Sequence, residues 1–299
     1  MVGITNKKRG GIAMQLGRLA AWYGLDRLDG AGIRAFLPLL ERLGYDMLWH
    51  PESRGYETFA LDSFLLGNST KLKIGSSITS IYARDAFAAR RGMITLNSLY
   101  SDRYILGLGV SHIPMVEGMR GHVYEKPIPA MRRYLDGICK DQPGADSWPI
   151  MIAALRPRML GVAAEKTRGA LPYNATPEHT ASARSILGPD KWLVAEQKVS
   201  LETDPVKARA LGRKELERYL SLPNYCNHWL ESGFTQADLD NGGSDLFIDA
   251  MMIWGEVATV KRKLRAHLDA GATQLAIQPI HPEGDFAERD RILTVLADI

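Results

Sequence analysis

The sequence predicts an α/β fold of the (β/α)8 TIM-barrel type. Short apolar segments with strand character alternate with amphipathic helical segments from one end of the 299-residue chain to the other. This order is typical of βα units repeated around a parallel sheet, and about eight such units make a (β/α)8 barrel. The length suits one barrel domain over 1–299. A doubly wound open sheet is the alternative, because periodicity does not show whether a sheet closes.

Start and stop signals define the elements of the first half of the chain. A first strand is predicted at 13–17, and Asp29 can cap a following helix that Gly44 ends. Helical periodicity and a second capping residue, Asp85, predict a helix that ends at Leu99. The other elements of this half are expected at 47–50 (strand), 58–68 (helix), 72–77 (strand) and 104–109 (strand).

The second half continues the alternation with one interruption. Pro127 can open a helix after a long loop, because a first helical turn does not need its N–H. Residues 204–256 carry several short helical patterns, and we interpret them as a helical insertion between the seventh and eighth strands. Residues 1–12 are expected to form a loose tail. The remaining strands are expected at 150–153, 169–171, 193–201 and 274–278.

The composition is that of a globular protein and excludes several functional classes. The net charge is only +3, and lysines and arginines are mixed with acids, so nucleic acid is not an expected partner. The two cysteines, Cys139 and Cys226, form neither a disulfide framework nor a metal-ligand spacing, which suits a reducing cytoplasm. No segment has the unbroken apolar length of a membrane span. We therefore expect a cytoplasmic protein that acts on a small molecule without a metal or a membrane.

The segment 103–112 carries the strongest functional signal of the chain. A fully apolar strand leads there to Gly107 and Gly109, and an ionisable ring follows at His112. Buried parallel strands are continuously apolar, and glycines at their carboxyl ends let a flat ligand approach the backbone. Glycine-rich strand exits also occur in α/β proteins that bind nothing there, so the neighbouring strand ends have to decide the interpretation.

The residues that follow each strand describe the predicted barrel mouth, where (β/α)8 enzymes carry their catalytic groups. They include aromatic side chains, hydroxyls and histidines but few carboxylates. This lining suits a planar, partly apolar ligand better than a metal, a carboxylate pair or a serine nucleophile, because clustered metal ligands and the Gly-x-Ser-x-Gly motif are missing from the sequence. The residues are Trp22, Tyr23, His50, Glu52, Ser76, Ser77, Ile78, Ser111, His112, Ala154–Arg158, Tyr173–Pro177, Glu196, Gln197, Gln278 and His281.

Residues 153–158 place the start of a helix at a strand exit. Backbone N–H groups and the positive end of the helix dipole can bind a phosphate there, and Arg156 and Arg158 would add charge. Pro157 at the first helical position and arginines in solvent explain the same residues without a ligand. Thr176 poses the same question, since it is a natural helix cap.

Five loose motifs follow one another in a fixed order over nearly the whole chain: Leu43–Glu52, Leu72–Ile78, Asp102–Gly109, Ile152–Met159 and Gly255–Gly271. Together they resemble the bacterial luciferase-like superfamily of flavin and deazaflavin oxidoreductases. Two further stretches resemble the branch that depends on coenzyme F420, an 8-hydroxy-5-deazaflavin. They are 107–127 and 173–179.

The resemblance implies a (β/α)8 barrel, a homodimer, and a coenzyme ring at the barrel mouth that carries hydride on its C5. The implied reaction is hydride transfer between coenzyme F420 and an unidentified small organic substrate. A non-prolyl cis peptide is implied at Ser77–Ile78, at the end of the third strand. The residues implied to bind the coenzyme are Ser76, Ser77, Ile78, Gly107, Gly109, Ser111, Ala154, Leu155, Arg156, Arg158, Tyr173 and Thr176.

For catalysis, the resemblance points to His112, with Glu52 and His50 orienting the ring. His112 stands where some relatives carry a glutamate, and a histidine titrates near neutrality and can move a proton. Alternatively, Glu52 caps the following turn and His50 is a hydrogen-bonded barrel histidine. Two positions depart from the family pattern: Ser53 replaces a histidine, and Arg156 replaces a glycine near the phosphate.

Two other functions are compatible with these residues. The same fold with FMN would be a monooxygenase that a separate reductase supplies. The departures at Ser53 and Arg156 also allow a relative that binds a flavin without turnover.

Overall fold

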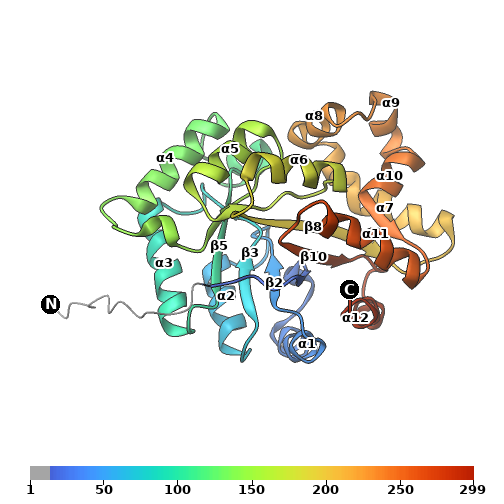
Figure 1. Cartoon of the computed structure of the whole chain (residues 1–299), viewed down its shortest axis with the longest axis horizontal. Coiled ribbons are helices and arrows are strands. Elements are labelled where there is room, and N and C mark those ends of the chain that lie inside the picture. The colour runs from blue at the N-terminus through green and yellow to red at the C-terminus, as the bar shows by residue number, and fades with distance from the viewer. Residues whose placement is uncertain (1–13) are drawn as a thin grey trace.

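The computed structural model describes residues 14–299, which form a closed barrel of parallel strands surrounded by helices (Figure 1). The strands are β1 (Leu19–Trp22), β2 (Met47–His50), β3 (Lys73–Ser76), β4 (Thr79–Ser80), β5 (Tyr104–Gly109), β6 (Ile150–Ile152), β7 (Gly169–Ala170), β8 (Trp192–Ser200), β9 (Met252–Trp254) and β10 (Gln274–Pro279).

The helices follow the strands along the chain. The α-helices are α1 (Gly30–Leu43), α2 (Thr58–Gly67), α3 (Ala86–Leu99), α4 (Pro127–Cys139), α5 (Pro157–Lys166), α6 (Pro177–Leu187), α7 (Pro205–Leu220), α8 (Pro223–Glu231), α9 (Gln236–Leu239), α10 (Asp245–Met251), α11 (Val257–Asp269) and α12 (Phe286–Val295). Three short 3-10 helices and one π-helical segment complete the set: η1 (Leu25–Arg27), η3 (Ala145–Ser147) and η4 (Asp240–Gly242), with η2 (Pro114–Met119) as the π-helical one.

The sheet closes on itself, which decides between the barrel and the open sheet. β10 pairs in parallel with β1, with Leu275 opposite Leu19, and also with β8, with Gln274 opposite Val194. β4 and β9 are short additions that pair with β5 and β8. The barrel proper therefore runs β1-β2-β3-β5-β6-β7-β8 and closes through β10. The predicted (β/α)8 fold is confirmed.

Helices α1 and α3 begin where the sequence predicts because their caps form. Asp29 accepts a hydrogen bond from the N–H of Gly32, and Gly44 ends α1 in the left-handed conformation at φ 83°. Asp85 likewise accepts from the N–H of Ala88 at the start of α3. These side chains satisfy N–H groups that a helix start leaves without a partner.

The first strand is the element that the sequence places wrongly. It is β1 at Leu19–Trp22 rather than 13–17; residue 13 and the expected tail 1–12 lie outside the described residues. Met14 and Leu16 are partly buried and pack against the apolar cluster inside the barrel. That packing accounts for the apolar pattern before β1, but strand pairing starts only at Leu19, opposite Leu275.

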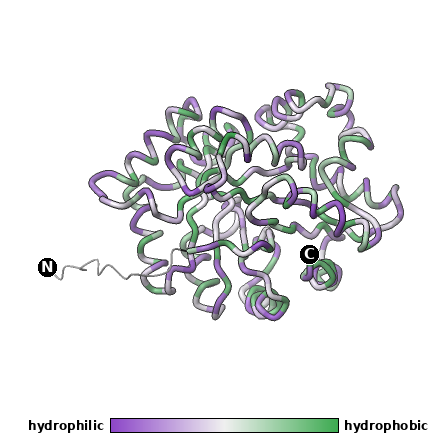
Figure 2. Tube along the Cα trace, in the orientation of Figure 1, coloured by the Kyte–Doolittle hydropathy of each residue, from purple (hydrophilic) through white to green (hydrophobic). Residues whose placement is uncertain are grey.

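Two apolar layers hold the barrel. One fills its interior and includes Trp22, Trp49 and Trp192, and the other lies between the strands and the surrounding helices. Inside, the Trp49 indole N–H donates to Oε1 of Gln274 at 2.8 Å. Hydrophobic and hydrophilic colour alternates along the outer helices in Figure 2, as expected for helices with one face on a core. Within residues 14–299, no helix is both long and apolar enough to cross a membrane.

The segment between β8 and β10 contains the predicted insertion, which is helical from α7 to α10 but ends in the added strand β9. It has a small core of its own that includes Leu216, Tyr225, Trp229 and Phe247. In Figure 1 it stands at one side of the barrel, in orange. Tyr173, which follows β7, packs against both this core and the barrel interior. The insertion is thereby joined to the mouth of the barrel.

Candidate active site

Partly exposed side chains follow four strands that are neighbours in the barrel, β3, β5, β6 and β7. Together these exits form an accessible strip across part of the mouth, which we call the exit strip. Its residues are Ser77, Ile78, Ser111, His112, Leu155 and Tyr173. The other predicted coenzyme contacts on these strands lie buried beneath it: Ser76, Gly107, Gly109 and Ala154.

The exit strip begins at a bulge between β3 and β4. The Ser77–Ile78 peptide bond is cis, which confirms the position predicted for a non-prolyl cis bond. The Ser77 N–H donates to the carbonyl of His50 at 2.7 Å, and the Ile78 carbonyl accepts from the N–H of Glu52 at 3.2 Å. The backbone after β2 therefore holds the bulge on both sides of the cis bond.

Glu52 lies beside this bulge. One carboxylate oxygen accepts the N–H of Ser80 at 2.9 Å, and the other accepts from the guanidinium of Arg84 at 2.6 Å. The Glu52 side chain is only 6% exposed. Glu52 thus fixes the backbone that follows the cis bond, close to the place where the resemblance puts the edge of the ring.

His50 faces the layer between β2 and α2. Its Nε2 lies 2.6 Å from Oδ1 of Asp62, and both residues are fully buried. Burial raises the pKa of the Asp62 carboxyl, while the neighbouring His50 acts in the opposite direction. Trp49 before it points into the barrel, so alternation along the strand turns His50 outward. The contact matches the interpretation of His50 as a hydrogen-bonded barrel histidine, and we leave it out of the catalytic set.

His112 lies at the middle of the exit strip. Ser111 before it adopts a φ of 56°, which turns the chain out of β5. The His112 ring packs against Tyr225 of the insertion, with ring centroids 5.6 Å apart. Burial lowers the pKa of His112, and the positive charge of Arg218 lowers it further. The imidazole is therefore neutral at pH 7 and can accept a proton.

The glycines of β5 are required by packing within the barrel. A Cβ on Gly107 would lie 1.9 Å from the carbonyl oxygen of Ser76, and a Cβ on Gly109 would lie 2.5 Å from the side chain of Ile78. The Ser76 hydroxyl also bonds to the carbonyl and the N–H of Gly107, at 2.9 and 3.1 Å. The backbone that comes close to Gly107 is that of β3, so packing within the barrel already requires this glycine, and the approach of a flat ligand to the strand exit stays a prediction.

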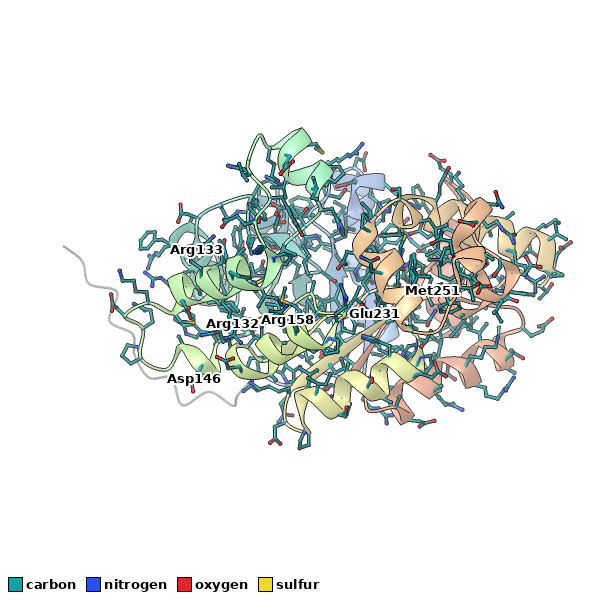
Figure 3. All side chains as sticks on the ribbon, turned by 90° about the horizontal axis from the view of Figure 1, so that it is seen from above. Arg132, Arg133, Asp146, Arg158, Glu231 and Met251 are labelled. Carbon is teal, nitrogen blue, oxygen red and sulfur yellow. The ribbon has the colours of Figure 1, made fainter. Side chains whose placement is uncertain are left out.

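The start of α5 is the predicted phosphate site. No side chain caps this helix. Arg156 donates through Nε to Oε2 of Glu231 at 2.9 Å, so α8 of the insertion already engages it. Arg158 is exposed, and Figure 3 shows it on α5 beside Glu231 on the neighbouring α8. The helix start and Arg158 are open to an anion, whereas Arg156 has to exchange Glu231 for one.

Thr176 has the structural role that the sequence allows. Its hydroxyl accepts the N–H of His179 at 3.4 Å and caps α6. Nε2 of the His179 ring in turn lies 2.6 Å from the carbonyl oxygen of Leu155. The α6 start thereby holds the β6 exit in place.

A buried ion pair lies below the mouth; Glu196 was expected among the mouth residues, whereas its partner Lys198 was not. Lys198 and Glu196 on β8 are 0% and 4% exposed in their side chains, with Nζ 3.2 Å from Oε1. Lys198 Nζ also donates to Oδ1 of Asn174 at 2.5 Å and to Oε1 of Gln278 at 3.4 Å, and it lies 3.9 Å from the centre of the Tyr173 ring. Burial lowers the pKa of Lys198 and raises that of Glu196, and each opposes the shift of the other.

Asn174 is held rigidly beside this pair. Its φ is 57°, its N–H donates to Glu196 at 3.2 Å, and its carbonyl accepts the Trp229 indole N–H at 3.1 Å. Since Lys198 binds Oδ1, the amide nitrogen Nδ2 must face the other way, and it has no partner among the described residues. Trp22 Nε1 is a second buried donor of this kind.

Tyrosines of the insertion cover part of the mouth. Tyr219 donates to the Tyr173 hydroxyl at 3.0 Å, and Tyr173 donates to Gln278 at 2.8 Å. The Tyr225 ring lies 5.1 Å from that of Tyr219 and 6.5 Å from that of Tyr173. These contacts tie α7 and α8 to the floor of the mouth.

Two adjoining cavities lie between α7 and the opposite rim of the mouth. One has a volume of about 420 Å³ and the other of about 520 Å³, and they share Arg27, Lys214 and Glu215. The rim is made by the chain after β1 and after β10. Because β6 stands four places from β1 in the barrel order, the α5 start lies across the mouth from these cavities.

Comparisons with known proteins agree in sequence and in fold. Residues 14–140 match the luciferase-like monooxygenase family model. The chain is 25% identical over 305 aligned positions to the 5,10-methylenetetrahydromethanopterin reductase of Methanolobus tindarius, which covers 85% of this chain and 92% of that protein. A Mycobacterium tuberculosis protein named "Putative coenzyme F420-dependent oxidoreductase" is 31% identical over 96 residues, 32% of this chain and 28% of that one.

Among solved structures, the coenzyme F420 dependent tetrahydromethanopterin reductase from Methanopyrus kandleri superposes with a TM-score of 0.71 at 17% identity, covering 95% of this chain and 98% of that one. The chain is similar to luciferase-like proteins in sequence over residues 14–140 and in fold over the whole barrel. The oxygenating constituent of 3,6-diketocamphane monooxygenase from Pseudomonas putida, solved with FMN, superposes with a TM-score of 0.68 at 14% identity, covering 96% and 97%. At these identities the structures show the shared fold alone.

The luciferase-like mouth fits a planar coenzyme at the exit strip. The Ser77–Ile78 bulge lies at the β3 end of the strip, and the uncapped α5 start lies at its β6 exit, two strands farther along the barrel. Two buried donors near the mouth, Trp22 Nε1 and Asn174 Nδ2, have no hydrogen-bond acceptor in the described part of the chain. Residues 14–299 contain no cluster of His, Cys, Asp and Glu that could hold a metal ion.

The sequence did carry a signal for the buried pair. Glu196 and Lys198 are opposite charges two positions apart in an otherwise apolar segment, so alternation puts both on one face of the strand. A buried face tolerates charge only when it is paired. Arg27, Glu215 and Arg218 gave no such signal, because they come together only through the fold.

Proposed function

We propose that the protein is an oxidoreductase that transfers a hydride between bound coenzyme F420 and a small organic substrate. The observation that carries the proposal is the exit strip, with the cis bulge at its β3 end, His112 on the next strand, and an uncapped helix start with exposed Arg158 at the β6 exit. The Mycobacterium tuberculosis relative named for coenzyme F420 supports the deazaflavin. A homodimer and a cytoplasmic location stay predictions.

Bound coenzyme would supply the carbon that donates or accepts the hydride. The α5 start and Arg158 would bind its anionic part through N–H groups and charge, and Arg156 would join them on release of Glu231. Ser77, Ile78 and Tyr173 would pack against the ring, while Glu52 keeps the bulge in shape.

His112 would move the proton that accompanies the hydride. When an alcohol is oxidised, the neutral imidazole accepts the hydroxyl proton while the hydride leaves carbon. In the reverse direction, the protonated ring returns that proton to the carbonyl oxygen. The lowered pKa of His112 favours the neutral form, which is the form that the oxidising direction needs.

The test is a fluorescence titration of the apoprotein with coenzyme F420 and with FMN. We expect tighter binding of coenzyme F420. Charge-assisted contacts to phosphate are worth about 1.5 kcal/mol or more, so Arg156→Gln and Arg158→Gln should each weaken binding roughly tenfold. Arg262→Gln on α11, an exposed arginine elsewhere, is the matched control and should leave binding unchanged.

A second function is favoured by the FMN-bound structure with the same fold. Tighter binding of FMN than of coenzyme F420 would replace the proposal by an FMN-dependent monooxygenase. Binding of coenzyme F420 without turnover of any alcohol or carbonyl compound in a broad screen would point to an inactive flavin-binding relative.

A further inference from the structure

The two adjoining cavities between α7 and the rim differ in character. The larger one, of about 520 Å³, has apolar walls on two sides, Leu211 from α7 and Ile280, Pro282 and Phe286 from the chain after β10. The smaller one, of about 420 Å³, is lined only by polar and charged residues: Arg27, Lys214, Glu215, Glu217, Arg218 and Ser221. A ligand that fills both therefore needs a carbon skeleton and a polar end.

Three cations and two carboxylates line the polar end: Arg27, Lys214 and Arg218, with Glu215 and Glu217. Arg27 and Arg218 share a single carboxylate, Glu215, at 3.8 and 4.0 Å. Glu215 is only 12% exposed and is held from below by the Gln278 amide at 3.1 Å. Both distances to the arginines are longer than a direct hydrogen bond. Arg218 uses one donor on the Tyr219 hydroxyl, so the two guanidinium groups keep most of their donors for another acceptor.

Of the other charged residues around the cavities, Lys214 and Asp26 already have partners of their own. Lys214 pairs with Glu283 at 3.3 Å across the larger cavity. Asp26 accepts from the Ser53 hydroxyl at 2.8 Å and from two backbone N–H groups. Burial lowers the pKa of His281, so it is neutral. Glu217 is exposed and lines the smaller cavity together with Glu215.

We propose that these cavities bind the organic substrate, and that the substrate carries a carboxylate, which Arg27 and Arg218 bind. The inference rests on the proposed function and adds the substrate class to it. Glu215 already shows that a carboxylate fits between the two guanidinium groups. The site lies across the mouth from the α5 start, so a coenzyme bound there by its anionic end would leave this side of the mouth to the substrate.

The experiment compares two matched probes by isothermal titration calorimetry at low salt. They are 4-oxopentanoate and 2-pentanone, which differ only in a carboxylate in place of a methyl group. We expect 4-oxopentanoate to bind at least tenfold more tightly. Arg27→Gln and Arg218→Gln should each remove most of that difference, since both side chains are more than half exposed and their loss leaves the fold intact.

Lys207→Gln is the control, because Lys207 is exposed on α7, the helix that also carries Arg218, and lines neither cavity. It should retain the full preference. Glu215→Gln removes the internal carboxylate and should strengthen binding of 4-oxopentanoate severalfold. Equal binding of the two probes, an equal loss in Lys207→Gln, or tighter binding of inorganic phosphate than of 4-oxopentanoate would each overturn the proposal.

Titration of the same samples with coenzyme F420 separates the two proposals. If the coenzyme binds and 4-oxopentanoate does not, the substrate class is wrong and the hydride-transfer proposal stands. If 4-oxopentanoate binds through the arginines and the coenzyme does not, the carboxylate site stands and the hydride-transfer proposal is wrong.

Discussion

Lys198→Met should destabilise the barrel strongly at neutral pH and only weakly in mild acid. Methionine keeps the length of the side chain but removes its charge, which leaves Glu196 buried without its cation. The cheapest response is for Glu196 to take up a proton. From an ordinary pKa near 4.3, protonation costs about 3.7 kcal/mol at pH 7 and about 1 kcal/mol at pH 5.

The assay is urea denaturation of the wild type and the variant at both pH values. The difference in the free energy of unfolding should fall from about 4 kcal/mol to about 1 kcal/mol between pH 7 and pH 5. The double variant Lys198→Met, Glu196→Gln should regain most of the stability at pH 7 and lose this pH dependence. A loss at pH 7 below about 1 kcal/mol, or a loss that is the same at both pH values, would refute the assignment of a buried charge pair.

Three further results are expected. Gly107→Ala should destabilise by about 3 kcal/mol or more in urea melts, because its Cβ meets a strand carbonyl, while Gly118→Ala, with open space around it, should be nearly neutral. Burial lowers the pKa of His228 and of His267 to about 4. The free energy of unfolding should therefore be highest above pH 6.5 and should fall as the pH drops toward 4, by up to about 3 kcal/mol for each histidine. A free energy of unfolding that does not change over this range would contradict their burial as neutral rings. His112→Ala should keep coenzyme binding and lose about 10² to 10⁴ in turnover, and near-normal turnover would remove His112 from the mechanism.

Local signals were enough to predict several elements from the sequence. The strands at 47–50 and 104–109 and the helices after Asp29 and Asp85 follow from apolar runs and capping side chains within a few residues. The first strand could not be placed in this way. Its limits depend on pairing with β10, which comes more than 250 residues later, at Leu275.

The site could be predicted only in outline for the same reason. The exit of the strand at 104–109 predicted His112 as a mouth residue, and the family resemblance predicted the cis bulge at Ser77–Ile78. The partners of Lys198 come from β7 and β10, and the partner of Arg156 is 75 residues away in the insertion. Contacts of that range leave no periodicity or spacing in the sequence.

Tyr173 belongs to both apolar clusters and bonds to Tyr219 on α7 and to Gln278 on β10. A ligand that shifts α7 has to move Tyr173, and Tyr173 is part of the exit strip. Occupancy of one side of the mouth is therefore coupled to affinity on the other. Thermodynamic linkage makes such coupling equal in both directions, so a carboxylate that tightens coenzyme binding must itself be bound more tightly when the coenzyme is present, by the same factor.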